Sequence, residues 1–174
     1  MKKTVTAFTL IETLVAITVL LVSLAGPMSL AAQALQSAYY ARDQVTAFYL
    51  AQEGIEYVRA IRDQNYLAGN SWLTGLESGQ QNCINAYCYV DLVYFSHQQC
   101  QTAADPASCL RIQMSTLGKL LNHASGVDTK YTRSVIITPV GLGDSQVIIS
   151  VRVQWISAGI NRSFDLSERI YNWL

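Results

Sequence analysis

The sequence predicts an α+β protein in which one long N-terminal helix packs on an antiparallel β-sheet. Residues 13–41 contain no Asp, Glu, Lys or Arg, which makes 29 consecutive uncharged positions near the N-terminus. Apolar side chains then recur at three- and four-residue steps as far as about residue 63, as in an amphipathic helix. After residue 130, apolar and polar side chains alternate, which is typical of half-buried strands. Helix first and strands later indicate a helix laid across a sheet.

Composition limits the class of protein before any motif is considered. The chain has 174 residues, of which 51% are hydrophobic and 14% charged, whereas soluble domains average about a quarter charged residues. Its 12 basic and 12 acidic side chains balance, and the only basic cluster is Lys2 and Lys3. We therefore expect no nucleic-acid partner, because binding to phosphates needs a concentrated basic face. High apolar content with no net charge also argues against disorder.

The N-terminus carries the strongest signal in the chain. Residues 1–7, MKKTVTA, form a short positive leader, and the run FTLIETLVAITVLLVSLAG that follows has a single acid, Glu12. Since about 20 apolar residues suffice to cross a bilayer, the first half of the helix is predicted to span a membrane. A carboxylate in such a segment costs roughly 2.5–3.5 kcal/mol, so we expect Glu12 to have a partner or a function.

This N-terminal segment resembles the cleavage and methylation signature of type IV pilins and type II secretion pseudopilins. The matching residues run from Phe8 through Glu12, FTLIE, and continue as TLVAI. The resemblance implies that a prepilin peptidase cuts between Ala7 and Phe8 and methylates the new amine of Phe8. The family usually has Gly before the cut, where this chain has Ala7. A pilin-like fold, that of a minor pilin or pseudopilin, is the corresponding expectation.

The position of Glu12 suggests how such subunits assemble. After cleavage the amine of Phe8 is a cation, and Glu12 lies four residues later, which is about one helical turn. If neighbouring helices stack with an axial offset, the Glu12 carboxylate of one subunit can neutralise the Phe8 amine of the preceding one. We therefore predict that Glu12 is needed for assembly.

Gly26 and Pro27 interrupt the predicted spanning helix. A proline inside a helix removes one hydrogen bond, so a kink or a local loss of helix is expected there. The resemblance implies that this segment can melt and extend when subunits pack. Two other interpretations of the N-terminus stay open: a secretory signal peptide cut after Ala25 or Ala32, and a plain signal anchor.

The predicted organisation has three parts: a leader peptide at 1–7, a hydrophobic transmembrane and filament-core helix at 8–41, and the remainder at 42–174. The last part combines the amphipathic half of the helix with a globular antiparallel head. Its helical face follows Phe48, Ala51, Ile55, Val58 and Arg62. The charges at Glu53, Glu56, Arg59, Arg62 and Asp63 are spaced for ion pairs on a solvated face.

The sequence predicts four strands in the head, at residues 87–95, 131–138, 147–156 and 160–170. In the third strand the odd positions from Val147 to Trp155 are apolar or aromatic, so they should face the core. Ala158 and Gly159 are predicted to form the turn to the last strand.

Four cysteines, Cys83, Cys88, Cys100 and Cys109, have the spacing C-x4-C, eleven residues, C-x8-C. This differs from the C-x2-C pairs of structural zinc, so we expect no metal and two disulfides formed in an oxidising compartment. Three pairings are possible, and short loops favour Cys83 with Cys88 and Cys100 with Cys109. The two histidines lie 26 residues apart and form no recognisable metal or catalytic pair.

No enzyme motif is present, and we expect neither catalytic activity nor a cofactor. The leading prediction is a structural subunit of a type IV pilus or type II secretion pseudopilus. By the resemblance, its partners are other pilin or pseudopilin subunits, prepilin peptidase and an inner-membrane assembly platform. We expect a single pass through the cytoplasmic membrane with the head outside the cytoplasm, and then a cell-surface or periplasmic filament. The alternative is a monomeric membrane-anchored extracytoplasmic ligand-binding protein; DNA uptake is a weaker option because the charge balance is neutral.

Overall fold

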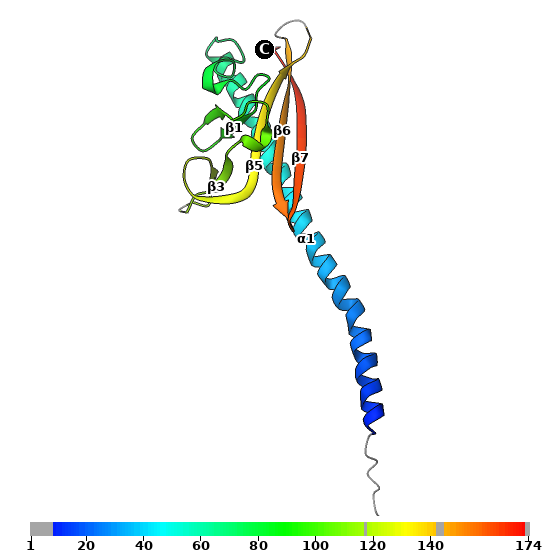
Figure 1. Cartoon of the computed structure of the whole chain (residues 1–174). Helices are drawn as coiled ribbons and strands as arrows, with labels where there is room; N and C mark the ends of the chain where they lie inside the picture. The colour runs from blue at the N-terminus through cyan, green and yellow to red at the C-terminus, as the bar shows by residue number, and fades with distance from the viewer. Residues whose placement is uncertain (1–8, 117, 142–144, 173–174) are drawn as a thin grey trace, which may run out of the picture. The chain divides into compact units, whose positions relative to one another are not determined.

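The structure, a computed structural model, describes residues 9–116, 118–141 and 145–172. It contains one long helix, α1 (Leu10–Leu67), and an antiparallel β-sheet (Figure 1). The α+β fold class predicted from the sequence is therefore confirmed. Contacts divide the chain into two compact units, with the boundary between Arg42 and Asp43.

The first unit is the N-terminal part of α1, as far as Arg42. Every described side chain in it is exposed. The helix continues through Gly26 and Pro27, so the predicted loss of helix at these residues does not occur here. A kink at this place stays a prediction.

In the second unit, α1 lies against the sheet along a stripe of small and apolar side chains. The helix backbone lies close to the sheet at Gly54, because a Cβ atom there would lie 3.0 Å from Cγ1 of Val151 on β6. Phe48, which was predicted to lie on the buried face, is 38% exposed, and its ring packs edge-on against Phe164. Nine helix residues are buried: Asp43, Ala47, Leu50, Ala51, Gly54, Ile55, Tyr57, Val58 and Ile61.

The sheet is organised around β5 (Val127–Pro139). One edge of β5 pairs with β6 (Gln146–Ser157), and β6 pairs in turn with β7 (Ile160–Tyr171). The opposite edge of β5 pairs with two short strands, β1 (Cys88–Asp91) near Val135 and β3 (Arg111–Met114) nearer the start of β5. The remaining elements are short: β2 (Ser96–Gln99), β4 (Leu121–Asn122) and the 3-10 helices η1 (Gly79–Gln81) and η2 (Pro106–Ser108).

The alternation in β6 is confirmed, since its odd positions from Val147 to Trp155 are all buried. The turn to β7 lies at Ala158 and Gly159, both with positive φ, as expected for a two-residue hairpin turn. The apolar face of β7 is less deeply buried: Ile170 belongs to the core, whereas Ile160 is 51% exposed. Among the described strands β7 pairs only with β6, so it forms an edge of the sheet.

The strand predicted at residues 87–95 is shorter than expected. β1 ends at Asp91, and residues 92–95 form the hairpin turn that leads into β2. The Asp91 carboxylate causes this ending, because its Oδ1 accepts hydrogen bonds from the backbone N–H groups of Val93 (2.9 Å) and Tyr94 (3.1 Å).

Disulfides join Cys83 to Cys88 and Cys100 to Cys109, which are the pairs favoured by loop length. The first lies beside β5, since the Cys83 carbonyl accepts a hydrogen bond from the Ile137 N–H at 2.9 Å. Each bond closes a short irregular loop, and this part of the head has little regular hydrogen bonding of its own.

Candidate functional site

The processing residues Ala7 and Phe8 lie outside the described residues. Glu12, the predicted assembly residue, lies in the first turn of α1 and is exposed. Its backbone N–H donates to the Thr9 carbonyl at 3.1 Å, so the helix is already formed at this position. An acid in the first helical turn is also favoured by the positive end of the helix dipole.

Three hydroxyl groups of the first unit are satisfied within the helix itself. Thr13, Thr18 and Ser23 each donate to the carbonyl three residues earlier, at 2.8 Å in every case. Because these hydroxyls are hydrogen-bonded within the helix, they do not need water as a partner. A helix whose hydroxyls are paired in this way can be surrounded by lipid or by other apolar helices.

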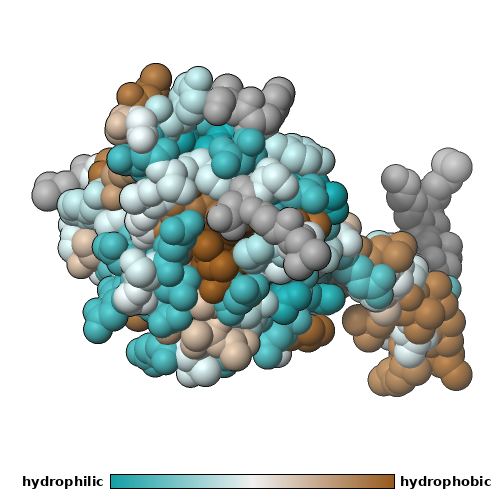
Figure 2. Space-filling model, turned by 90° about the horizontal axis from the view of Figure 1, so that it is seen from above, coloured by the Kyte–Doolittle hydropathy of each residue, from teal (hydrophilic) through white to brown (hydrophobic). Residues whose placement is uncertain are grey.

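The apolar side chains of the first unit have no cover within the described chain. Leu10 is 83% exposed and Val22 76%, and the stretch is long and apolar enough to cross a membrane. Folded proteins in water rarely expose apolar patches beyond a few hundred Å². The segment is therefore compatible with a single membrane span. Figure 2 shows the contrast in composition, since the viewed face of the folded unit is mostly hydrophilic and the N-terminal helix mostly hydrophobic.

Pro27 leaves one helical carbonyl without its usual donor. It has no N–H to give to the carbonyl of Ser23, four residues earlier. A Cβ atom at the adjacent Gly26 would meet nothing within 4 Å, so no neighbour in this chain requires a glycine there.

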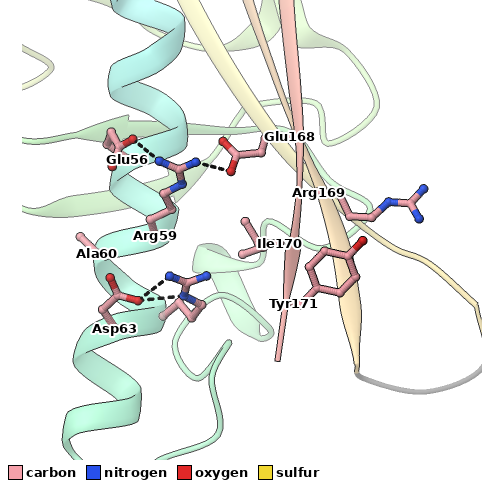
Figure 3. A pocket seen from close by; sticks show the side chains of 9 residues that line it. Glu56, Arg59, Ala60, Asp63, Glu168, Arg169, Ile170 and Tyr171 are labelled. Atoms are coloured by element: carbon pink, nitrogen blue, oxygen red, sulfur yellow. Dashed lines mark hydrogen bonds and ion pairs between the residues drawn. The ribbon is translucent and has the colours of Figure 1, made fainter. Parts of the chain in front are cut away.

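Charged residues form a polar pocket between α1 and β7 in the second unit (Figure 3). Arg59 pairs with Glu56 on its own helix (2.5 Å) and with Glu168 on β7. Arg62 pairs with Asp63 at 2.8 Å. The pocket has a volume of about 620 Å³, and its lining contains three acidic and three basic residues: Glu56, Asp63 and Glu168, with Arg59, Arg62 and Arg169.

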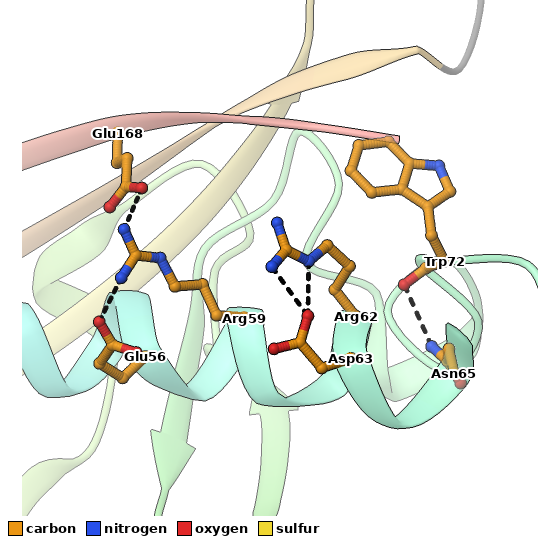
Figure 4. Close-up of polar contacts among 7 residues, drawn as sticks. All are labelled: Glu56, Arg59, Arg62, Asp63, Asn65, Trp72 and Glu168. Carbon is orange, nitrogen blue, oxygen red and sulfur yellow. Dashed lines mark hydrogen bonds and ion pairs between the residues drawn. The ribbon is translucent and has the colours of Figure 1, made fainter. Parts of the chain in front are cut away.

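This arrangement of ion pairs connects α1 to β7. The hydrogen bond that Arg59 donates to the Glu168 carboxylate raises the pKa of Arg59, as expected for a cation held between two carboxylates. Beyond the pocket, the Asn65 side chain donates to the carbonyls of Trp72 (3.2 Å) and Thr74 (2.9 Å). Figure 4 shows these polar contacts following one side of α1, where they attach β7 and the first loop to the helix. Part of the helix face that was predicted to be solvated therefore holds β7 and the first loop against α1.

Sequence reasoning missed a buried cation, Arg133, in the middle of β5. Its side chain donates to the carbonyls of Leu50 (3.2 Å) and Val90 (2.6 Å) and to the Glu53 carboxylate (2.7 Å), which joins α1, β1 and β5. The alternation that faces Val135 toward the core places Arg133 on the same face, so a signal was present. Burial lowers the pKa of Arg133, and Glu53 opposes that shift.

The two histidines occupy separate structural positions. Nε2 of His97 lies 3.0 Å from the Gly75 carbonyl and must donate to it, so Nδ1 accepts the hydroxyl of Tyr57 at 2.8 Å. Burial lowers the pKa of His97 and raises that of Tyr57. His123 stacks on Tyr89 with ring centroids 4.9 Å apart, and burial lowers its pKa to about 4.

Within residues 9–116, 118–141 and 145–172, no group of three or more His, Cys, Asp or Glu side chains is placed to hold a metal ion. Comparisons with protein-family models, with curated proteins and with solved structures found no match to this chain. The function of this chain is therefore inferred from its own residues. The features that stand out are Glu12 and the uncovered apolar helix that follows it.

Proposed function

We propose that this chain is a structural subunit of a type IV pilus or a type II secretion pseudopilus. In this proposal prepilin peptidase cuts it between Ala7 and Phe8, and it assembles through its N-terminal helix. The observation that carries the proposal is an exposed helix with a single acid, Glu12, followed by 29 uncharged residues. The helix resides in the cytoplasmic membrane first, and neighbouring helices replace the lipid on assembly.

The exposed apolar side chains of the first unit need an apolar surrounding. The first unit buries none of its described side chains, so its folding supplies no reason for so apolar a sequence. Lipid and a bundle of like helices both provide an apolar surrounding. An anchor that stays in lipid can use this acid only through the dipole of its own helix, whereas stacked subunits can also set it against the amine of a neighbour.

The second unit suits a structural role. Its charged pocket is internally neutralised, and its buried polar groups join strands to the helix. A rigid head of this kind supports packing between subunits through its exposed faces. The competing function, a monomeric anchored binding protein, would give Glu12 no partner in another subunit.

Replacing Glu12 by Ala in the native host tests the proposal. We expect the variant to insert in the membrane in normal amount and to be depleted from sheared or purified filaments, because the register contact is lost. Glu77→Ala is the matched control, since Glu77 is an exposed acid in a loop of the head. Equal incorporation of the Glu12 variant and the control would contradict the proposed assembly role.

A further inference from the structure

One end of the second unit is identified by contacts between α1 and the ends of the long strands. The Tyr131 hydroxyl donates to Oδ1 of Asp43 at 3.2 Å, and the ring of Tyr131 lies against Trp155 with centroids 6.1 Å apart. Phe48 contacts Phe164 on β7 with ring centroids 5.9 Å apart. The start of the packed part of α1 therefore lies near the turn that joins β6 to β7.

Large apolar side chains are exposed at this end. On the helix, Val45 is 55% and Tyr49 65% exposed. Ile156 and Ile160 flank the turn between β6 and β7 and are 52% and 51% exposed. The turn itself consists of small residues, so the two isoleucines are its most prominent apolar groups.

Cationic residues accompany these apolar side chains. Arg111, Lys130 and Arg162 border the same pocket of about 230 Å³, together with Ile156, and no acidic residue is among the described residues that line it. Lys130 reaches the buried Asp43 with an Nζ to Oδ2 distance of 2.6 Å. Basic residues therefore outnumber acidic ones around this pocket, even with Asp43 counted.

In the sequence, the packed part of α1 follows directly on its uncharged part. That part ends at Ala41, and Val45 follows four residues later, about 6 Å along a helix. Tyr39 and Tyr40 come directly before Ala41. Tyrosines at the end of an apolar span are typical of the boundary between lipid tails and head groups.

We propose that Val45, Tyr49, Ile156 and Ile160, with Arg111, Lys130 and Arg162, form a membrane-contact face that rests on the outer surface of the bilayer before assembly. The apolar side chains enter the interface, and the cations bind the phosphates of anionic phospholipids. This inference rests on the membrane span of the proposed function. Lipid suits the face better than a second copy of the chain does, because the chain has no net charge whereas anionic lipid presents a continuous negative surface.

The membrane-contact face can be tested with the full-length chain in vesicles. A bimane label is attached to Ala158→Cys, in the β6–β7 turn, or to Ser78→Cys, an exposed position in the loop before η1. The vesicles contain phosphatidylcholine with or without phosphatidylglycerol, together with brominated lipid as the quencher. We expect quenching of the label at position 158, stronger with phosphatidylglycerol, and no quenching of the label at position 78.

Ile156→Ser with Ile160→Ser, made in the Ala158→Cys chain, should abolish most of that quenching while the chain still floats with the vesicles. These isoleucines are exposed, so the head should keep its fold, which circular dichroism checks. Equal quenching at positions 158 and 78 in chains that float with vesicles would overturn the face and leave the span intact. Failure of every chain to float would instead remove the span on which the proposed function depends. If the label at position 158 escapes quenching only at a high protein-to-lipid ratio, a second copy of the chain covers this face, and the proposed lipid contact is wrong.

Discussion

The two halves of α1 relate composition to burial in opposite ways. The half before Asp43 lacks charge over 29 residues, yet all its described side chains are exposed. The half from Asp43 to Leu67 carries acids and bases, yet nine of its residues are buried. Apolar content alone therefore does not indicate a core in this chain. The spacing of small and apolar residues, which matches the face of the sheet, decides what is buried, and the uniformly apolar half is suited to lipid or to other helices.

The strongest test of this comparison removes the buried cation. Arg133→Met should lower the free energy of unfolding of the head by about 3 kcal/mol, because two buried carbonyls lose their donor and each such acceptor costs about 1–3 kcal/mol. The Glu53 carboxylate is half-buried and returns to water, so it adds little to this loss. Chemical denaturation followed by circular dichroism measures the change. Arg152→Met is the control, since Arg152 pairs with Asp165 at the surface and should change the same quantity by less than about 1 kcal/mol. Similar losses for both variants would contradict the structural role of Arg133.

A second test compares equivalent truncations in a core strand and in the exposed helix. Ile149 on β6 is fully buried, so Ile149→Ala should destabilise the head by about 3 kcal/mol. Leu20→Ala, in the first unit, should leave the denaturation of the head unchanged, because Leu20 is 57% exposed and contributes nothing to that core. Loss of head stability in the Leu20 variant would show that the first unit has a folding role.

The two glycines of α1 sharpen the comparison within one element. Gly54→Val adds methyl groups where a Cβ already meets Val151 at 3.0 Å, so overpacking should cost about 2 kcal/mol of head stability. Gly26→Val adds the same atoms where nothing lies within 4 Å, and the thermal midpoint of the head should not change. A Gly54 variant as stable as the parent would mean that the helix and sheet can move apart without cost.

The smallest effect concerns acid. Burial lowers the pKa of His123 to about 4 in the folded state, below the value of about 6.5 in an unfolded chain. The unfolded state therefore binds the proton more readily, and stability present above about pH 6.5 should be lost progressively toward about pH 4. Between about pH 7 and about pH 6 the loss should be on the order of 1 kcal/mol.

His123→Phe is the control for this pH effect. It keeps the aromatic contact with Tyr89 and the backbone hydrogen bond to Asp91, and it should make the unfolding free energy less dependent on pH over that range. An unchanged slope would assign the acid sensitivity to other groups, of which His97 is the first to examine because burial lowers its pKa as well.

Sequence reasoning predicted the elements that have long, regular patterns. The long helix followed from the uncharged run and the three- and four-residue spacing, and the last hairpin followed from the alternation in β6 and the Ala158-Gly159 turn. The disulfide pairs followed from loop length. Strands β2, β3 and β4 were missed because they are two to four residues long and mostly polar, so hydrogen bonding to neighbours rather than side-chain pattern defines them.

The buried charges were harder to predict for a physical reason. Asp43 lies on the same helical stripe as Ala47 and Leu50, and Arg133 lies on the same strand face as Val135, so spacing alone could have located both. A charged residue is nevertheless normally assigned to solvent, because burial is favourable only when partners are in place. Those partners, Lys130 for Asp43 and Glu53 for Arg133, are distant in sequence and become neighbours only in the fold.

The most direct test of the pilin-like assignment is the intact mass and N-terminal sequence of the protein isolated from its native host. The proposed function predicts a mature chain that begins with N-methylated Phe8 and lacks residues 1–7. A chain that retains Met1, or one that begins near Gly26 or after Ala32, would contradict it. Either of those results would favour an anchored or secreted domain and remove the main reason to expect assembly through Glu12.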